Sequence, residues 1–304
     1  MAGPGRRAPW ENRGVTTPGD GVLSSARASE KVSAWPAYAK ASLACHVGAG
    51  IAALAVPSAW PWALGAVAAN HALLTAGGLW PRSRWLGSNW THLPDAAVAR
   101  GEVALTIDDG PDPSVTPAVL DLLDRHGARA TFFCIGRQAR AERELCREIV
   151  RRGHSVQNHS DRHSHAFSLL GPAAMAREIG AAQVALADIS GELPRYFRAP
   201  AGLRNPFLAP VLQRLDLQLV SWTRRGFDTV RRDPAALLAR LGRGLAAGDI
   251  LLLHDGHAAR TRDGAVLALA VLPTLLDRIA TAGLRAVTLP EAARQDAATR
   301  DVPP

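Results

Sequence analysis

The chain has 304 residues, of which 47% are hydrophobic, and a formal net charge of +8. This length holds one large α/β domain plus an appendage. Its three cysteines, Cys45, Cys134 and Cys146, are an odd number without metal-ligand spacing, which argues against a disulfide framework and a cysteine-based zinc site.

The basic residues are concentrated near the N-terminus. Eight Lys and Arg residues but only three acidic residues precede Leu86, a local net charge of +5. This distribution fits anionic lipid headgroups better than nucleic acid, and no nucleic-acid-binding pattern is present. Residues 1–36 are rich in Gly, Pro, Ser, Ala and Arg without hydrophobic periodicity, so we expect a disordered basic tail.

Residues 41–81 contain no Asp, Glu, Lys or Arg. Because one membrane pass takes about 20 apolar residues, this run is long enough for two passes. A connector rich in Pro and Trp at 57–62 divides it. We therefore expect a two-helix membrane hairpin at 37–81; a buried helical pair is the alternative. Basic residues outside both ends favour an inner-membrane location with the following domain on the cytoplasmic face.

After a linker at 82–100, apolar strand-like runs alternate with helical stretches. The strands are expected near 103–107, 130–135, 154–157, 195–198, 217–222, 249–254 and 285–288. The helices are expected at 116–126, 137–152, 172–189, 205–214, 234–246 and 265–282. This rhythm predicts a parallel sheet, closed into a distorted, incomplete seven-stranded β/α barrel over 101–292, with a C-terminal tail at 293–304. In such barrels the chemistry lies at the carboxyl ends of the strands.

Polar residues do follow the predicted strand ends. Asp108 and Asp109 come directly after strand 103–107 and precede a Gly-Pro turn. A bend there would let both carboxylates reach one cleft, where one holds a metal and the other takes a proton. The alternative is an ordinary turn of Asp, Gly and Pro.

His159 and His163 follow strand 154–157 and are four residues apart, which would place both imidazoles on one side of a helical turn. With one carboxylate they form a set that leaves open positions on a divalent metal. Zinc is the first choice, and cobalt, nickel or iron are compatible.

Three further clusters end later strands. Arg198 precedes a Pro-Ala-Gly loop that could present backbone N–H groups to an oxyanion. Asp228 lies near Trp222 and Phe227, whose rings suit either a core or a pocket wall. His254 ends an apolar strand, where a general acid or base would be well placed.

Together these clusters resemble the polysaccharide deacetylase family, also known as the NodB homology domain or carbohydrate esterase family 4, over roughly residues 100–290. The matching segments are Thr106-Ile107-Asp108-Asp109-Gly110-Pro111, His159-Ser160-Asp161-Arg162-His163, Arg198-Ala199-Pro200-Ala201-Gly202, Trp222 to Asp228, and Leu252-Leu253-His254. The family's fold is an incomplete β/α barrel, in agreement with the strand count.

The resemblance implies a role for each matching residue. Asp109, His159 and His163 would hold the metal, Asp108 would be the general base and Arg198 would orient it. The remaining residues would serve the leaving group, the oxyanion or the substrate: His254 as general acid, Asp228 tuning it, the Ala201 backbone at the oxyanion, and Pro200, Trp222 and Phe227 along the substrate wall.

Three positions depart from the family pattern: Ser164, Ala201 and Thr229 replace the usual Pro, Tyr and Trp. We expect these positions to lie on the substrate-facing walls, so they bear on which substrate is bound more than on which reaction is catalysed. The expected function is metal-dependent removal of an N-acyl group, acetyl first, from an amino sugar in a polysaccharide or glycolipid. The alternatives are a deformylase or deacetylase of an isoprenoid-linked amino sugar, and a non-catalytic glycan-binding module.

Overall fold

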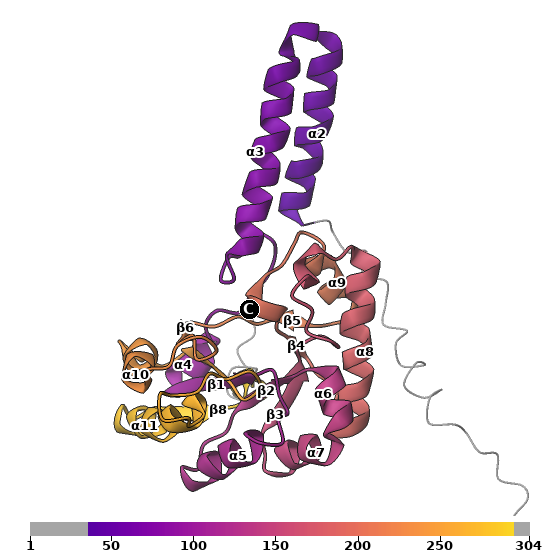
Figure 1. The fold of residues 1–304 in the computed structure, drawn as a ribbon. Helices are drawn as coiled ribbons and strands as arrows, with labels where there is room; N and C mark the ends of the chain where they lie inside the picture. The colour runs from indigo at the N-terminus through magenta and orange to yellow at the C-terminus, as the bar shows by residue number, and fades with distance from the viewer. Residues whose placement is uncertain (1–35, 295–304) are drawn as a thin grey trace, which may run out of the picture. The chain divides into compact units, whose positions relative to one another are not determined.

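The computed structural model describes residues 36–294 (Figure 1). The tail predicted for residues 1–36 lies outside the described residues except for Pro36. The tail predicted for 293–304 lies outside them from residue 295 onward.

The centre of the fold is a parallel sheet whose order is β5-β4-β3-β2-β1-β7-β6, with β8 also paired to β1. Its strands are β1 (Glu102–Asp108), β2 (Thr131–Cys134), β3 (Ser155–Asn158), β4 (Tyr196–Phe197), β5 (Gln218–Leu219), β6 (Arg224–Arg225), β7 (Ile250–His254) and β8 (Arg285–Val287). All seven predicted strands are present, and the short strand β6 was not predicted. Among the described strands, β5 and β6 share no ladder, so the curled sheet is open there. This agrees with the predicted incomplete barrel.

Helices surround the sheet (Figure 1). They are α4 (Asp95–Ala99), α5 (Thr116–Arg125), α6 (Gly136–Ala141), α7 (Arg143–Arg151), α8 (Pro172–Ser190), α9 (Leu208–Arg214), α10 (Pro234–Gly242), α11 (Leu267–Thr281) and α12 (Leu289–Ala292). Helix α10 is capped at its N-terminus, since the Asp233 side chain accepts a hydrogen bond from the N–H of Ala235 at 2.9 Å.

Strand alternation on β1 separates the core from the site. Leu105 and Ile107 face outward into a buried apolar cluster that includes Leu275 of α11. Thr106 and Asp108 occupy the alternate positions and face the inside of the barrel. Because both faces are covered, every residue of β1 is buried.

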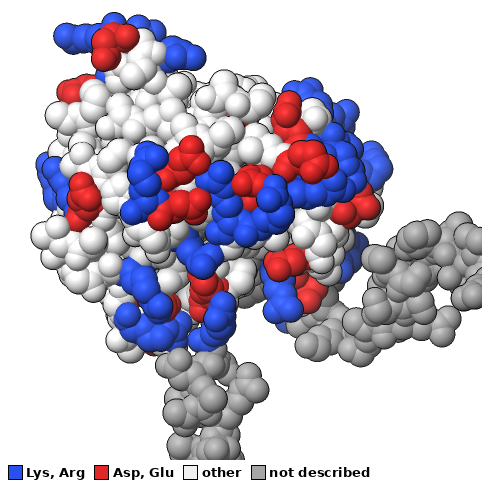
Figure 2. Space-filling view, turned by 90° about the horizontal axis from the view of Figure 1, so that it is seen from below, with Lys and Arg blue, Asp and Glu red and all other residues white. Residues whose placement is uncertain are grey.

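One face of the molecule shows Lys and Arg interspersed with Asp and Glu (Figure 2). Ion pairs also connect the helices. Arg152, which follows α7, lies 2.7 Å from Asp121 and 2.9 Å from Asp124 of α5. On the face drawn, basic groups therefore alternate with acidic ones instead of forming a continuous positive stripe.

The segment predicted as a membrane hairpin does form two helices. These are α2 (Ala37–Ala55) and α3 (Trp60–Leu79), joined by a 3-10 turn at Pro57–Ala59. Among residues 36–294, however, no helix combines the length and the hydropathy needed to cross a membrane. The predicted membrane-spanning hairpin is therefore not supported. Alanine and glycine dominate both helices and contribute little hydropathy, and Lys40, His46, Asn70 and His71 lower it further.

The end of α3 packs closely on the backbone at Arg204, whose N–H donates to the Gly78 carbonyl at 3.2 Å. A Cβ at position 78 would overlap the Arg204 carbonyl oxygen. We expect Gly78→Ala to lower the free energy of unfolding by about 1–3 kcal/mol. Gly48→Ala in α2 is the control: a Cβ there meets nothing within 4 Å, so better helix propensity should raise stability by up to about 1 kcal/mol. Thermal denaturation distinguishes the two; equal shifts would contradict the packing argument.

Candidate active site

The two adjacent carboxylates reach one cavity because the backbone turns between them. Asp108 faces the inside of the barrel as the last residue of β1. Strict alternation would aim Asp109 outward, but its φ of 76° is left-handed and re-aims the side chain. Both residues line a cavity of about 280 Å³, close to the lower end of the range of roughly 300–1,000 Å³ for small-molecule sites.

Arg198 holds Asp108 in place. Its Nη1 donates to Asp108 Oδ1 at 2.7 Å and to Thr106 Oγ1 at 2.8 Å. Its Nη2 donates to the Ser221 carbonyl at 2.7 Å, and its Cζ lies 4.1 Å from the centre of the Phe133 ring. Burial lowers the pKa of Arg198 and the Asp108 charge opposes this. The buried pair is hydrogen-bonded throughout, so the Asp108 carboxylate has one fixed orientation.

Asp109, His159 and His163 form the only group of potential metal ligands found among the described residues. Asp109 Oδ1 lies 3.3 Å from Nε2 of each histidine, and the three donor atoms are within 4.8 Å of one another. Asp109 Oδ1 is buried and has no hydrogen-bond partner. A buried, unpartnered carboxylate oxygen facing two imidazole nitrogens is the arrangement that a bound cation would satisfy.

The protonation states suit metal binding. His159 Nδ1 lies 2.8 Å from the Arg198 carbonyl, which can only accept, so Nδ1 carries a proton and Nε2 is left for a ligand. Burial and the nearby His159 lower the pKa of His163 to about 4. Burial raises the pKa of Asp109, but the neighbouring imidazoles, His159 first, outweigh it and hold that pKa well below its ordinary value. Burial lowers the pKa of His159, but the charges of Asp108 and Asp109 outweigh it and raise that pKa, as expected where two carboxylates face a site for a cation.

The prediction of a helical turn carrying the two histidines was wrong. Residues 159–164 are not helical, and Ser160 and His163 have left-handed φ values of 65° and 51°. The loop is held instead by Asn158, whose Oδ1 accepts from the Ser160 N–H at 2.9 Å, and by Ser160 Oγ, which accepts from the His163 N–H at 3.1 Å. The imidazoles still converge, with ring centres 4.8 Å apart.

His254 and Asp228 form a second buried pair. The His254 Nδ1 lies 2.9 Å from Asp228 Oδ1, and its backbone N–H donates to Oδ2 at 2.7 Å. Asp228 is fully buried. Burial lowers the pKa of His254, but the hydrogen bond and charge of Asp228, with the charges of Asp108 and Asp109, outweigh it and raise that pKa.

The residues predicted for the substrate wall divide into two groups. Ala201, with a φ of 55°, and Trp222 line the cavity. Pro200 and Phe227 are not among its lining residues, and the Phe227 ring packs instead against the guanidinium of Arg225, with 4.9 Å from Cζ to the ring centre.

Five lining residues were not predicted as part of the site: His165, Gly202, Arg225, Leu252 and His257. Thr229, which was expected to face the substrate, also lines the cavity. His257 Nδ1 lies 3.4 Å from Asp109 Oδ2. His165 was expected to be a surface residue; it is exposed but lines the cavity. The position of His257 three residues after His254 is the only local signal, and it does not reveal that the chain there has a left-handed φ of 56°.

A further unpredicted carboxylate supports the loop behind Asp109. Asp255 is buried and accepts a hydrogen bond from Thr116 Oγ1 at 2.5 Å. Burial raises the pKa of Asp255 to about 7. The Thr116 hydroxyl also accepts from the Asp112 N–H at 2.8 Å, so the pair connects β7 to the loop after β1.

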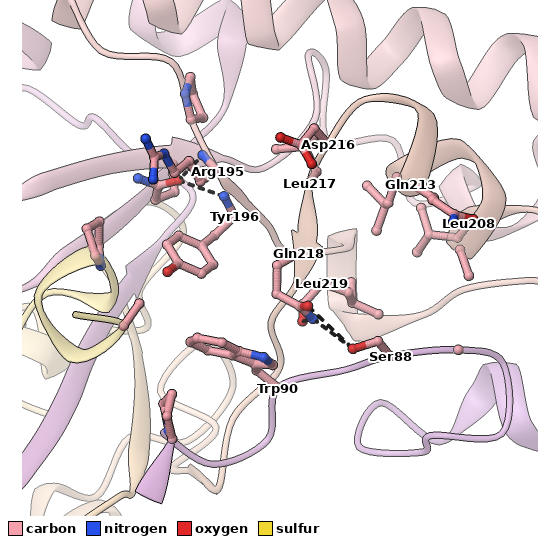
Figure 3. A pocket seen from close by; sticks show the side chains of 18 of the residues that line it. Ser88, Trp90, Arg195, Tyr196, Leu208, Gln213, Asp216, Leu217, Gln218 and Leu219 are labelled. Carbon is pink, nitrogen blue, oxygen red and sulfur yellow. Dashed lines mark hydrogen bonds between the residues drawn. The ribbon is translucent and has the colours of Figure 1, made fainter. Parts of the chain in front are cut away.

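A larger cavity, of about 1640 Å³, lies beside edge strand β5 (Figure 3). Trp90 and Tyr196 face each other in its wall with ring centres 5.5 Å apart, and Ser88 is hydrogen-bonded to Gln218 (Figure 3). It contains none of the predicted catalytic or metal-binding residues. The smaller cavity is therefore the candidate active site, because it is the one that holds the convergent titratable groups.

Comparison with known proteins agrees with this placement. The polysaccharide deacetylase family model matches residues 95–220, which include Asp108, Asp109 and the two histidines. A chitooligosaccharide deacetylase from a Bradyrhizobium species is 35% identical over 186 residues, covering 58% of this chain and 84% of that protein. The chain belongs to the polysaccharide deacetylase family. It is a hydrolase acting on carbon–nitrogen amide bonds, and the resemblance found in the sequence is confirmed.

Two further polysaccharide deacetylase relatives span most of the domain. A peptidoglycan-N-acetylglucosamine deacetylase from Bacillus cereus is 33% identical over 194 residues, covering 63% of this chain and 88% of that protein. The structure of a family 4 carbohydrate esterase from Streptomyces lividans in complex with acetate is 35% identical, covers 61% of this chain and 91% of that one, and has a TM-score of 0.56. The family match ends before Trp222, Asp228 and His254, so their membership of the site rests on the geometry described above.

Proposed function

We propose that this protein removes an N-acyl group, acetyl first, from an amino sugar in a polysaccharide or glycolipid, and that it does so with a divalent metal. The observation that carries the proposal is the convergence of the Asp109, His159 and His163 donor atoms within 4.8 Å in the cavity that Asp108 and His254 also line. Relatives named for chitooligosaccharides and for peptidoglycan N-acetylglucosamine make N-acetylglucosamine the first substrate to test.

Asp109, His159 and His163 would hold the metal, with zinc the first choice and cobalt, nickel or iron compatible with the same donors. When bound, such an ion polarises the amide carbonyl and lowers the pKa of a water from about 15.7 toward 7. The set supplies three protein ligands, which leaves positions open for water and substrate.

Asp108 is positioned to act as general base. Its Oδ1 is occupied by Arg198 at 2.7 Å, so Oδ2 remains to take a proton from the attacking water. Arg198 orients the carboxylate and places a buried positive charge beside it.

His254 is positioned to act as general acid. Since Asp228 occupies its Nδ1, its Nε2 is the nitrogen left to protonate the departing amine. The backbone N–H of Ala201 is proposed to stabilise the oxyanion, and Trp222 to form the wall beside it. Pro200 and Phe227 do not line the cavity, so no direct contact with the substrate is proposed for them.

The pairing of His254 predicts a pH dependence. The pKa of His254 is raised, which favours the protonated form that a general acid needs, and activity should fall as pH rises through that pKa. Asp228→Asn removes the leading cause of the increase, so burial prevails, the alkaline limb moves to lower pH and activity at neutral pH falls by about 10- to 100-fold. A pH profile of kcat/KM checks this. An unmoved alkaline limb in the variant would show that Asp228 does not tune the acid.

The direct test of the reaction is acetate release. Purified full-length protein is incubated with zinc, cobalt or nickel and with N-acetylated chitooligosaccharides, and mass spectrometry follows loss of acetyl groups. Loss of formyl from a formylated lipid-linked amino sugar, without any loss of acetyl from acetylated substrates, would favour the deformylase alternative. Absence of any acyl release from the folded, metal-loaded protein would contradict the proposal.

The alternative of a non-catalytic glycan-binding module does not fit this site. It would require a broken metal or base set, whereas Asp108, Asp109, His159, His163 and His254 are all in place. Metal analysis distinguishes the two, because a binding module has no need of the ion. The inner-membrane location and the cytoplasmic orientation stay predictions, and the proposed reaction does not depend on a membrane anchor.

A further inference from the structure

Each acidic group at the active site faces a basic side chain, whereas one cation there, Arg225, faces no acidic residue among residues 36–294. Asp108 is paired with Arg198, Asp228 with His254, and Asp109 faces the imidazoles. Arg225 lines the same cavity, and no acidic residue among residues 36–294 lies within ion-pair distance of it. Its Nε is buried and has no hydrogen-bond partner.

The neighbouring arginine, Arg224, does have an acidic partner, so the lack of one is specific to Arg225. Arg224 Nε is paired with Asp249, and its guanidinium also donates to the carbonyls of Arg243 and Gly244. Arg224 and Arg225 form the two-residue strand β6, and successive strand residues point to opposite faces. Arg224 is therefore neutralised outside the cavity, while Arg225 faces the cavity with its charge unpaired.

Two aromatic rings hold the Arg225 guanidinium. Its Cζ lies 5.0 Å from the ring centre of Trp222, which also lines the cavity, and 4.9 Å from that of Phe227. Contacts with ring faces fix a planar guanidinium but leave its N–H donors available.

We propose that Arg225 is an anion subsite, which binds a phosphate or carboxylate carried by the amino-sugar substrate close to the N-acyl group. A guanidinium stays charged and presents paired N–H donors that match these planar or tetrahedral oxyanions. A substrate anion would also satisfy the buried Nε, which is otherwise unpaired. The proposal rests on the proposed function and narrows its substrate class to anionic amino sugars.

The test compares matched substrates that differ in one charged group. The probes are N,N′-diacetylchitobiose, its 1-phosphate, and the disaccharide of N-acetylglucosamine and N-acetylmuramic acid, which carries a carboxylate. The wild-type protein should have a kcat/KM about 10- to 100-fold higher for at least one anionic probe than for the neutral one, mainly through a lower KM. Comparing kcat/KM for the 1-phosphate with kcat/KM for the carboxylate-bearing disaccharide shows which anion the subsite binds.

Arg225→Gln should bring the anionic-to-neutral ratio of kcat/KM close to one, and Arg225→Lys should keep part of it, because the charge remains without the paired donors. Arg240→Gln is the matched control. Its guanidinium also packs on Phe227, at 5.1 Å from the ring centre, but it is exposed and does not line the cavity, so the ratio should not change.

A wild-type protein that deacetylates the neutral probe and both anionic probes equally well would overturn the subsite and leave the proposed function standing. So would an Arg225→Gln variant that keeps the full preference. Failure to release acetate from all three probes would overturn both. Since the wild-type comparison needs no variant, the subsite is tested even if Arg225→Gln does not fold.

Discussion

Asp108→Asn is expected to lower kcat/KM for acetate release by about 10²- to 10⁴-fold, the usual contribution of a positioned general base. Asparagine keeps the shape of the side chain, and its oxygen can still accept from Arg198 Nη1. It cannot take a proton from water. Acetate release from chitooligosaccharides at saturating metal measures the effect.

Asp108→Asn also leaves the buried Arg198 charge without its counter-ion, which costs about 3–5 kcal/mol of stability when a buried pair is broken. Circular dichroism and thermal denaturation must therefore accompany the assay. Asp112→Asn is the control, because it lies on the same loop but accepts from the Ser114 N–H at 2.8 Å and does not line the cavity. Turnover by a folded Asp108→Asn protein at the wild-type rate would refute the general-base role.

His163→Ala is expected to remove bound metal and, with it, activity. The loss of a direct ligand should cost more affinity than the about 10- to 100-fold typical of an outer-shell partner. The His163 side chain lines the cavity, so its truncation enlarges an existing cavity and opens no new void in the apolar core. Metal content after dialysis and chelator competition measure the affinity independently of turnover, and the same analysis identifies which metal the protein retains.

His165→Ala is the matched control for this metal prediction. His165 lines the same cavity, and its ring centre lies 6.1 Å from that of His163, but it is outside the donor set. We expect it to keep the wild-type metal affinity. Equal metal retention by both variants would contradict the Asp-His-His site.

Much of the site could be anticipated from local patterns. The strands were visible because both faces of a parallel sheet are buried, so that β1 and β7 read as apolar runs. The polar residues that end these runs, Asp108 and His254, lie in register in the sheet. Adjacent parallel strands bring their carboxyl ends to the same edge, which is why distant motifs met in one cavity.

Other features depended on backbone angles that composition does not reveal. The left-handed φ of Asp109 turns its carboxylate into the cavity, and similar values at Ser160 and His163 replace the predicted helical turn with a loop. Non-glycine residues adopt such angles only where surrounding contacts hold them, so spacing alone could not foresee them.

For residues 41–81 the predicted local structure was correct, but the predicted membrane crossing was not supported. The absence of charge in 41–81 was correctly associated with helices, but the absence of charge is a different property from high hydropathy. Alanine favours a helix because it loses no side-chain entropy, yet it buries little apolar surface. Helices α2 and α3 formed, and the expectation of membrane crossing was not supported.

By itself, the sequence determined the alternation of strands and helices, the family, and the residue types at strand ends, since each follows from short-range periodicity and spacing. The family resemblance implied that Arg198 serves Asp108 and that Asp228 serves His254, but only the tertiary structure shows the contacts and what is left over. Asp108 is joined to Arg198 across 90 positions and Asp228 to His254 across 26, while Arg225 Nε has no hydrogen-bond partner among residues 36–294. Such pairings depend on the order of strands and on the direction of each side chain, and neither is encoded in any local stretch of the chain.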